Sequence, residues 1–235
     1  MTTVIEVAPA PVKEDFITVK TTLPARPFPP TESRPSVTTE RLLLRPLRAD
    51  DVTALHELRT QEEVMKWTYI GRIDRDMEET RGKLSHYLPP KDVNNYQFAI
   101  CLKATGEMIG IGGCHVMEAE FGWPELGYMF RKEHWGGGLA TEFVRAFMPV
   151  WAGLPREEAE VKVDPRSATG DGVSEEQLVA ITANLNVKSQ AVLRKSGWEL
   201  FITWKGGRTL EDPGDTVVPL PTFRFFPGRK ANAEV

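Results

Sequence analysis

Three consecutive glycines, Gly136 to Gly138, stand between a segment with strand character and one with helix character. The apolar stretch ELGYMF at 125–130 precedes them, and the strong helix-forming stretch LATEFVRAF begins at Leu139. Glycine is unfavourable inside a helix but allows left-handed turns and close approach of the backbone to a ligand. The first N–H groups of a helix lack internal partners and lie at its positive end, so this junction is suited to hold a phosphate. A simple turn explains an isolated glycine run equally well.

Composition limits the classes of protein that fit. The chain has 235 residues, of which 41% are hydrophobic and 26% charged, so one sizeable core is feasible. A net charge of −4 disfavours nucleic acid and anionic membranes as partners. The N-terminus has no secretory signal pattern and no stretch reaches membrane-spanning length, so we expect a cytoplasmic protein. Cys101 and Cys114 lie in apolar stretches and are expected to be buried free thiols.

The chain divides into segments of different composition. Residues 1–36 are rich in Pro, Thr and charge and are expected to form an extended N-terminal arm. Within this arm DFITVK (15–20) is a candidate edge strand, so ordered and disordered arms both fit the sequence. Residues 37–227 are expected to form the main domain and residues 228–235 a tail. The charged stretch 153–177, punctuated by Gly and Pro, is interpreted as an inserted surface loop.

Apolar periodicity and breakers predict the secondary structure of the main domain. Their order predicts one α/β domain with a mixed sheet. The expected strands span 41–47, 96–102, 108–117, 125–130, 178–185, 198–204 and 222–226, and the expected helices span 49–60, 76–88, 139–151 and 186–197.

Two common phosphate-binding patterns do not fit the glycine run. The dinucleotide pattern needs wider glycine spacing, and the P-loop needs Lys after its last glycine, where this chain has Leu139. Four segments instead resemble the GNAT superfamily of acyl-CoA-dependent N-acetyltransferases, especially the RimJ/RimL-like group of ribosomal-protein alanine acetyltransferases. They are TTERLLLRPLRADD (38–51), the hairpin at 96–117, ELGYMFRKEHWGGGLATEF (125–143) and NVKSQAVLRKSGWE (186–199).

The resemblance implies a single-domain GNAT fold, with a mixed, mostly antiparallel sheet of about seven strands and about four helices. It also implies acetyl-CoA as acyl donor and no metal. The pyrophosphate would lie on backbone amides of the glycine loop, and the pantetheine arm would pair with the strand at 125–130. For Arg131 a phosphate contact and a solvated basic turn are equally consistent. The implied cofactor-binding residues are Met129, Phe130, Arg131, Trp135, Gly136, Gly137, Gly138, Leu139, Ala140, Thr141 and Asn186.

Acetyl transfer to an amine requires a neutral amine, a stabilised oxyanion and a protonated thiolate. Glu125 is the candidate base or water-positioning residue, although an ordinary solvated carboxylate at a strand end fits equally well. Ser189, in the Asn-x-x-Ser position of the resemblance, is the candidate donor to the thiolate. A backbone N–H near Met129 is the expected oxyanion donor. His115 and His134 are interpreted as non-catalytic.

The acceptor is expected to be a primary amine, either a small molecule or a peptide N-terminus, bound by a monomer or a homodimer. Trp67, Tyr69 and Trp123 are the candidate lining residues, and core or rim packing is the alternative for each. Acidic residues that could attract an amine are Glu62, Glu63, Asp212 and Asp215. Two non-catalytic alternatives stay open, an acyl-CoA sensor and a protein-interaction module.

Overall fold

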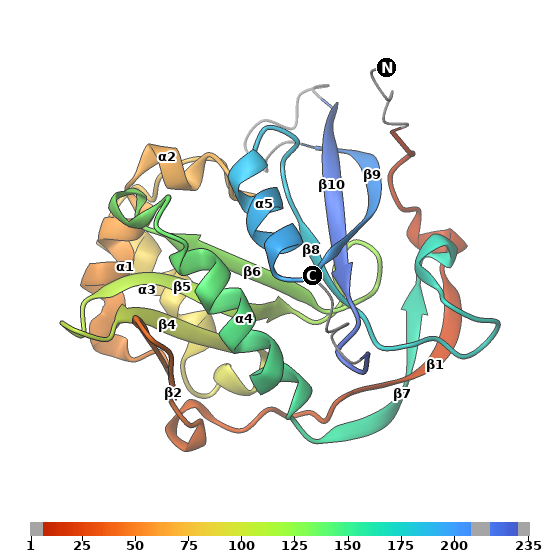
Figure 1. Ribbon diagram of the computed structural model, residues 1–235, viewed down its shortest axis with the longest axis horizontal. Coiled ribbons are helices and arrows are strands. Elements are labelled where there is room, and N and C mark those ends of the chain that lie inside the picture. Colours follow the sequence, from red (N-terminus) through yellow and green to blue (C-terminus); the bar gives the residue numbers. More distant parts are fainter. Residues whose placement is uncertain (1–6, 208–216, 230–235) are drawn as a thin grey trace.

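An eight-stranded sheet forms the centre of the computed structural model, which describes residues 7–207 and 217–229 (Figure 1). All neighbouring strands are antiparallel except β6 and β8. The mostly antiparallel, mixed α/β fold expected from the sequence is therefore confirmed. In sheet order the strands are β2 (Val37–Thr38), β3 (Leu42–Arg45), β4 (Tyr96–Leu102), β5 (Met108–Val116), β6 (Glu125–Phe130), β8 (Leu178–Ile181), β10 (Val217–Phe225) and β9 (Glu199–Gly207).

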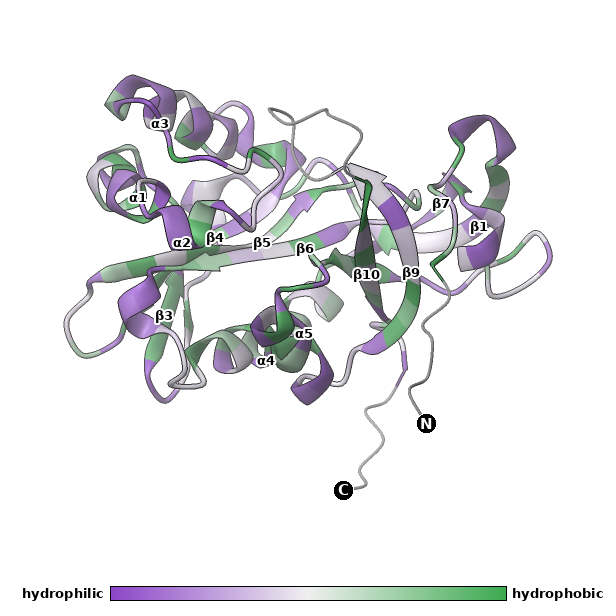
Figure 2. Cartoon of the chain, turned by 90° about the horizontal axis from the view of Figure 1, so that it is seen from above, coloured by the Kyte–Doolittle hydropathy of each residue, from purple (hydrophilic) through white to green (hydrophobic). Residues whose placement is uncertain are grey.

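Helices cover both faces of this sheet (Figure 2). α1 (Val52–Arg59) and α3 (Met77–Leu84) lie on one face, and α4 (Leu139–Ala152) and α5 (Val187–Lys195) on the other. The short α2 (Glu62–Met65) follows α1 and was not expected as a separate helix. No helix among the described residues is long and apolar enough to span a bilayer.

The larger core cluster lies between the sheet and α4. Apolar residues recur along one side of α4 at helical spacing, with Phe143, Phe147 and Trp151 fully buried. The opposite face of the sheet packs on Leu55 and Leu58 of α1. Both cysteines are free and buried, as expected.

The described part of the N-terminal arm contributes to a second, smaller sheet of two strands. Its strand β1 (Ile17–Pro24) pairs antiparallel with β7 (Arg156–Val163), which lies within the stretch 153–177. The expectation of a loop is therefore wrong for β7. Its charged residues hide the strand pattern, and the partner that completes the pairing lies far away in the sequence.

The parallel strands β6 and β8 make only one residue pair, Glu125 with Val179, and then diverge (Figure 1). Beyond this pair the edge of β6 that faces β8 has no partner strand among the described residues. This divergence leaves a place beside β6 where an extended ligand can pair with the backbone, as an added strand would.

Candidate active site

The glycine run forms the turn into α4. Gly136 has φ 82° and Gly138, the N-cap of α4, has φ 81°, values that other residues rarely adopt. Gly137 has no such requirement. A Cβ atom on Gly136 or Gly137 would meet nothing within 4 Å, so open space lies in front of the loop. Gly138 makes no side-chain cap, which leaves the first amides of α4 available to an anion.

Arg41, which lies between β2 and β3, connects these strands to the glycine loop by hydrogen bonds. Its guanidinium donates to the carbonyl of Gly137 at 2.8 Å and to Glu142 at 2.7 Å. Glu142 also accepts from the Thr39 hydroxyl at 2.6 Å and from the backbone of Arg41 at 2.9 Å. Burial alone would raise the pKa of Glu142, but these hydrogen bonds lower it overall. Sequence reasoning missed Arg41 as a contact of the loop, because nothing in the spacing joins residues 41 and 137.

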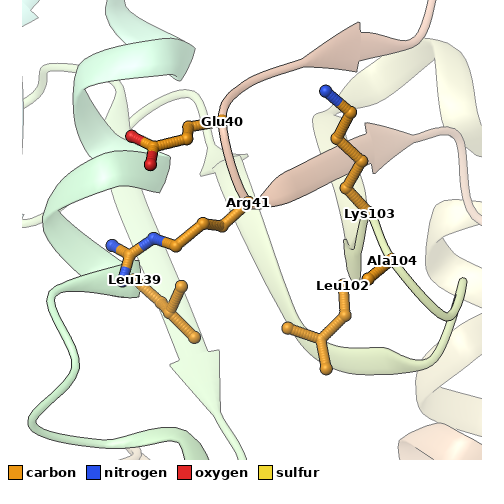
Figure 3. Close-up of a pocket in the computed structure, with 6 residues that line it drawn as sticks. All are labelled: Glu40, Arg41, Leu102, Lys103, Ala104 and Leu139. Atoms are coloured by element: carbon orange, nitrogen blue, oxygen red, sulfur yellow. The ribbon is translucent and has the colours of Figure 1, made fainter.

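Figure 3 shows Arg41 reaching the start of α4 beside Leu139. A surface hollow of about 620 Å³ lies here, and among the described residues Leu139 is the only predicted site residue that lines it. The hollow therefore does not coincide with the predicted donor site. The lining residues are Glu40, Arg41, Leu102, Lys103, Ala104 and Leu139.

Trp135 connects the glycine loop to both sides of the gap between β6 and α5. Its indole N–H donates to the carbonyl of Phe130 at 2.8 Å, so this acceptor is already used within the protein. The ammonium of Lys188, on α5, lies 5.2 Å from the centroid of the Trp135 ring. Lys188 was not among the predicted residues, because its position only becomes relevant once α5 is placed opposite the loop.

Two basic residues of the loop are neutralised by carboxylates. Arg131 pairs with Glu57 of α1 and with Glu107, the latter at 2.8 Å, and Lys132 pairs with Glu63 at 2.8 Å. The guanidinium of Arg131 is thus directed to the α1 face, so the structure does not support its prediction as a phosphate contact. Its carboxylate partners are distant in sequence and could not be paired from the pattern.

Tyr128 and Ser189 meet across the gap. The Tyr128 hydroxyl lies 2.9 Å from Ser189 Oγ. Asn186 caps α5 by accepting from the backbone N–H of Ser189 at 3.2 Å, which places Ser189 in the first turn. Burial raises the pKa of Tyr128 to about 12, so its hydroxyl stays protonated. Tyr128 was missed, although strand alternation puts it on the face opposite Glu125.

Glu125 lies at the amino end of β6, where β6 and β8 meet. Glu125 as a whole residue is half-buried. Burial raises the pKa of its carboxyl to about 8, and repulsion from Glu120 acts in the same direction. A carboxyl with this pKa can both accept and release a proton near neutral pH, which is what a general base requires.

The predicted acceptor residues do not form one group. Tyr69 is 68% exposed, and Trp67 is half-buried with the Lys66 ammonium 4.9 Å from its ring centroid. Trp123 is completely buried and donates to Ser167 at 2.9 Å, so it has no surface to offer an acceptor and this prediction is wrong. Asp212 and Asp215 lie outside the described residues. Within the described part of the chain, no group of three His, Cys, Asp or Glu residues is arranged to hold a metal ion.

A comparison with known protein families identifies the class to which this chain belongs. A family model described as an acetyltransferase (GNAT) domain matches residues 41–199, and the chain belongs to this family. The chain is therefore an N-acetyltransferase of the GNAT type, as the sequence resemblance implied.

Known relatives agree with this assignment. An uncharacterized N-acetyltransferase of Bacillus licheniformis, p20, is 31% identical over 135 residues, which are 55% of this chain and 73% of the relative. A GNAT-family acetyltransferase of Bacillus anthracis superposes with a TM-score of 0.62 at 19% identity, over 83% of this chain and all of that one. RimL, a ribosomal L7/L12 alpha-N-protein acetyltransferase solved with coenzyme A, has a TM-score of 0.61 at 17% identity, over 82% and 98% of the chains.

Proposed function

We propose that this protein transfers an acetyl group from acetyl-CoA directly to a primary amine while both are bound. The observation that carries the proposal is the placement of two complementary proton-transfer groups on one strand. Glu125, with a raised pKa, and Tyr128, which stays protonated, lie on opposite faces of β6 beside the divergence from β8.

The residues around the divergence fit the acyl donor. The open glycine loop offers unpaired amides to the pyrophosphate, and the free edge of β6 offers backbone groups to the pantetheine arm. Lys188 lies on α5, on the other side of the gap from β6, and its ammonium faces the ring of Trp135. It supplies a positive charge on that side. We accordingly replace Arg131 by Lys188 as the phosphate-directed cation.

Glu125 accepts a proton from the ammonium, and the neutral nitrogen then attacks the acetyl carbonyl carbon. A backbone N–H of β6 near Met129 stabilises the oxyanion. When the carbon–sulfur bond breaks, Tyr128 donates its proton to the thiolate, and Ser189 hydrogen-bonds the developing phenolate. The nitrogen releases a second proton as the amide forms, and this proton restores the phenol of Tyr128. The products are an amide and the free thiol, and the proton on Glu125 returns to solvent.

The class of acceptor follows from the same chemistry, because the carboxylate of Glu125 can accept a proton from a cationic amine. RimL, which has a similar fold, is an alpha-N-protein acetyltransferase of ribosomal L7/L12. For this chain we propose a primary amine, with a peptide N-terminus as the first candidate.

The test has two parts. Isothermal titration with acetyl-CoA should give saturable binding, and its absence would contradict the donor site. Thiol release is then followed with peptides carrying N-terminal Ala or Ser, with spermidine, with a free amino acid and with an aminoglycoside. Turnover with at least one amine is expected. Binding without turnover throughout would instead identify a sensor.

A further inference from the structure

The small sheet of β1 and β7 leaves one strand edge without a partner. β1 pairs with β7 over its whole length, and no bulge interrupts the register. On its far side β1 is covered around Lys20 by residues 172–174. β7 has no second neighbouring strand among the described residues, so it is an edge strand of eight residues. It lies beside β1 on the side of the molecule opposite α1 (Figure 1).

The hydrogen bonds of β1 show which backbone groups of β7 face this edge. The N–H of Lys20 donates to the carbonyl of Gly172, and the carbonyl of Lys20 accepts from the N–H of Ser174, both at 2.9 Å. Lys20 and Glu160, which lie opposite each other, are therefore a pair without mutual hydrogen bonds, and both backbone groups of Glu160 point away from β1. The pattern alternates along the strand, so the same holds for Glu158.

Two other contacts agree with this orientation of the backbone. The carbonyl oxygen of Lys162, two residues after Glu160, lies 2.1 Å from the position that a Cβ on Gly122 would take, so this carbonyl also points away from β1. The N–H of Ala25 donates to the carbonyl of Pro155 at 2.8 Å, as expected for the alternate pairs that bond within the sheet. Because Gly122 closes the edge at Lys162, the free part of the edge lies at the two glutamates.

The side chains at the free edge are acidic and unpaired. Side chains alternate along β7, and Val161 packs in the core cluster that contains Trp123, so Glu158 and Glu160 share the outer face. Both glutamates are exposed. Neither carboxylate forms an ion pair or a hydrogen bond within the described part of the chain, although Lys20 lies opposite Glu160. The edge thus combines unpaired backbone groups with two free negative charges.

The charges determine which kind of strand can pair with this edge. Free strand edges attract other strands, and charged side chains limit this association. Two copies of β7 that pair antiparallel about residues 158–160 would set glutamate opposite glutamate, and like charges directly opposite are destabilising. Arg156, at the start of β7, is already paired with Glu176 at 2.8 Å. A second copy of this chain is therefore a poor partner, whereas a strand that carries cations is a favourable one.

We infer that β7 is a docking edge for an extended basic segment of another protein, which adds to the small sheet as a third, antiparallel strand. The backbone of the partner exchanges hydrogen bonds with Glu158 and Glu160. Residues directly opposite each other share a face of the sheet, so the partner carries Lys or Arg at two positions separated by one residue. This inference goes beyond the proposed acetyl transfer and does not depend on it.

The probe is the synthetic peptide acetyl-Thr-Arg-Thr-Arg-Thr-Arg-Thr-amide. It has no amine to acetylate, so its binding is independent of acetyl transfer. The isomer acetyl-Arg-Thr-Thr-Arg-Thr-Thr-Arg-amide has the same charge but cannot set two arginines opposite the two glutamates. Binding is measured by isothermal titration at about 50 mM salt, where screening of surface charges is weak. We expect saturable binding of the alternating peptide and about fivefold weaker binding of the isomer.

Glu158→Pro tests the backbone of the edge. It removes the N–H that faces the free side and keeps the hydrogen bonds to β1, and proline is tolerated at such edge positions. We expect the affinity for the alternating peptide to fall at least about tenfold with the Tm preserved. Thr22→Pro is the matched control, because Thr22 lies opposite Glu158 and its N–H faces the far side of β1. Glu158→Gln removes only the charge and should weaken binding about twofold to fivefold.

Equal binding of the two peptides would overturn the inference, because it would show charge attraction without strand pairing. Absence of binding, or wild-type affinity in Glu158→Pro, would overturn it as well. If Glu158→Pro lowers the Tm, the test uses the wild-type protein and the alternating peptide N-methylated at its central arginine, which lacks the N–H that pairs with β7. We expect at least a tenfold loss of affinity here too, and unchanged affinity would count against the docking edge.

Discussion

The hydroxyl group of Tyr128 lies 2.9 Å from Oγ of Ser189. This contact joins β6 to the first turn of α5, across the gap that opens where β6 and β8 diverge. The sequence resemblance had assigned the thiolate donor to Ser189. In the structure the serine is the partner of a buried phenol, which is the more acidic of the two hydroxyl groups. We therefore assign the proton to Tyr128 and a supporting hydrogen bond to Ser189.

Tyr128→Phe is expected to reduce kcat about tenfold to a hundredfold, because the thiolate then leaves without a proton donor. Binding of acetyl-CoA, measured by titration, should be nearly unchanged. Ser189→Ala should have a smaller effect in the same direction. Tyr87→Phe removes another phenol hydroxyl whose pKa burial raises, in the cluster with Leu55 and Leu58, and serves as the control. Equal kcat in Tyr128→Phe and the control would remove Tyr128 from the mechanism.

The rate should depend on the ionisation of Glu125. Only the carboxylate accepts a proton, so kcat should rise with pH about a midpoint near 8. Measuring the profile with two acceptors of different basicity shows whether the midpoint belongs to the enzyme or to the amine. A midpoint due to Glu125 stays fixed when the acceptor changes. Glu125→Gln should lower kcat roughly a hundredfold and abolish this midpoint. A midpoint that follows the acceptor would argue against Glu125.

The same carboxyl should make stability depend on pH. Its pKa in the folded protein is about 8, above the ordinary value of 4.5, so folding favours the protonated form. The wild type should therefore lose stability as the pH rises from about 4.5 to about 8. Glu125→Gln lacks this loss, and its Tm should exceed that of the wild type by more at pH 9 than at pH 5. A constant difference would mean that the carboxyl is not desolvated.

Gly137→Ala tests the glycine loop without straining it. Gly136 and Gly138 need a positive φ, so substitutions there would disturb the turn itself, whereas alanine at 137 meets no protein atom within 4 Å. We expect the Tm to be kept and the Kd for acetyl-CoA to rise about tenfold, because the methyl group enters the space of the pyrophosphate. Gly82→Ala, inside α3 and also without close neighbours, is the control and should gain up to about 1 kcal/mol of stability. Unchanged affinity in Gly137→Ala would place the phosphate elsewhere.

Arg41→Gln should loosen the glycine loop. The substitution removes the hydrogen bond to Gly137 and the ion pair with Glu142. We expect weaker acetyl-CoA binding, by about threefold to tenfold, with kcat at saturation little changed. Arg81→Gln breaks an exposed pair with Glu78 on α3 and should leave binding unaffected. A fall in kcat without a change in Kd would contradict a positioning role.

Much of the main domain could be predicted because its signals are local. The helix from Leu139 and the strand at 125–130 follow from periodicity and from the glycines between them, and both begin where expected. The family could be recognised from the same segments.

The features that were missed depend on distant partners. β7 carries the charged sequence REEAEVKV and becomes a strand only because β1 pairs with it. The position of Arg131 in the loop fitted a phosphate contact and a solvated basic turn equally well, but Glu57 and Glu107 neutralise it. The aromatic character of Trp123 suggested a binding surface, whereas the added β1–β7 sheet helps to bury it, with Val19 and Val163 in the same cluster. None of these contacts can be recognised from the residue spacing or the apolar periodicity of the sequence.

The added sheet has a practical consequence for where the chain can be shortened. The family match covers residues 41–199, yet Val19 and Phe28 before it, and Phe223 after it, are at most 2% exposed. A fragment trimmed to the matched range would lose these side chains and present the faces they cover to solvent. We therefore expect the smallest unit of this protein that folds to extend well beyond the matched range at both ends.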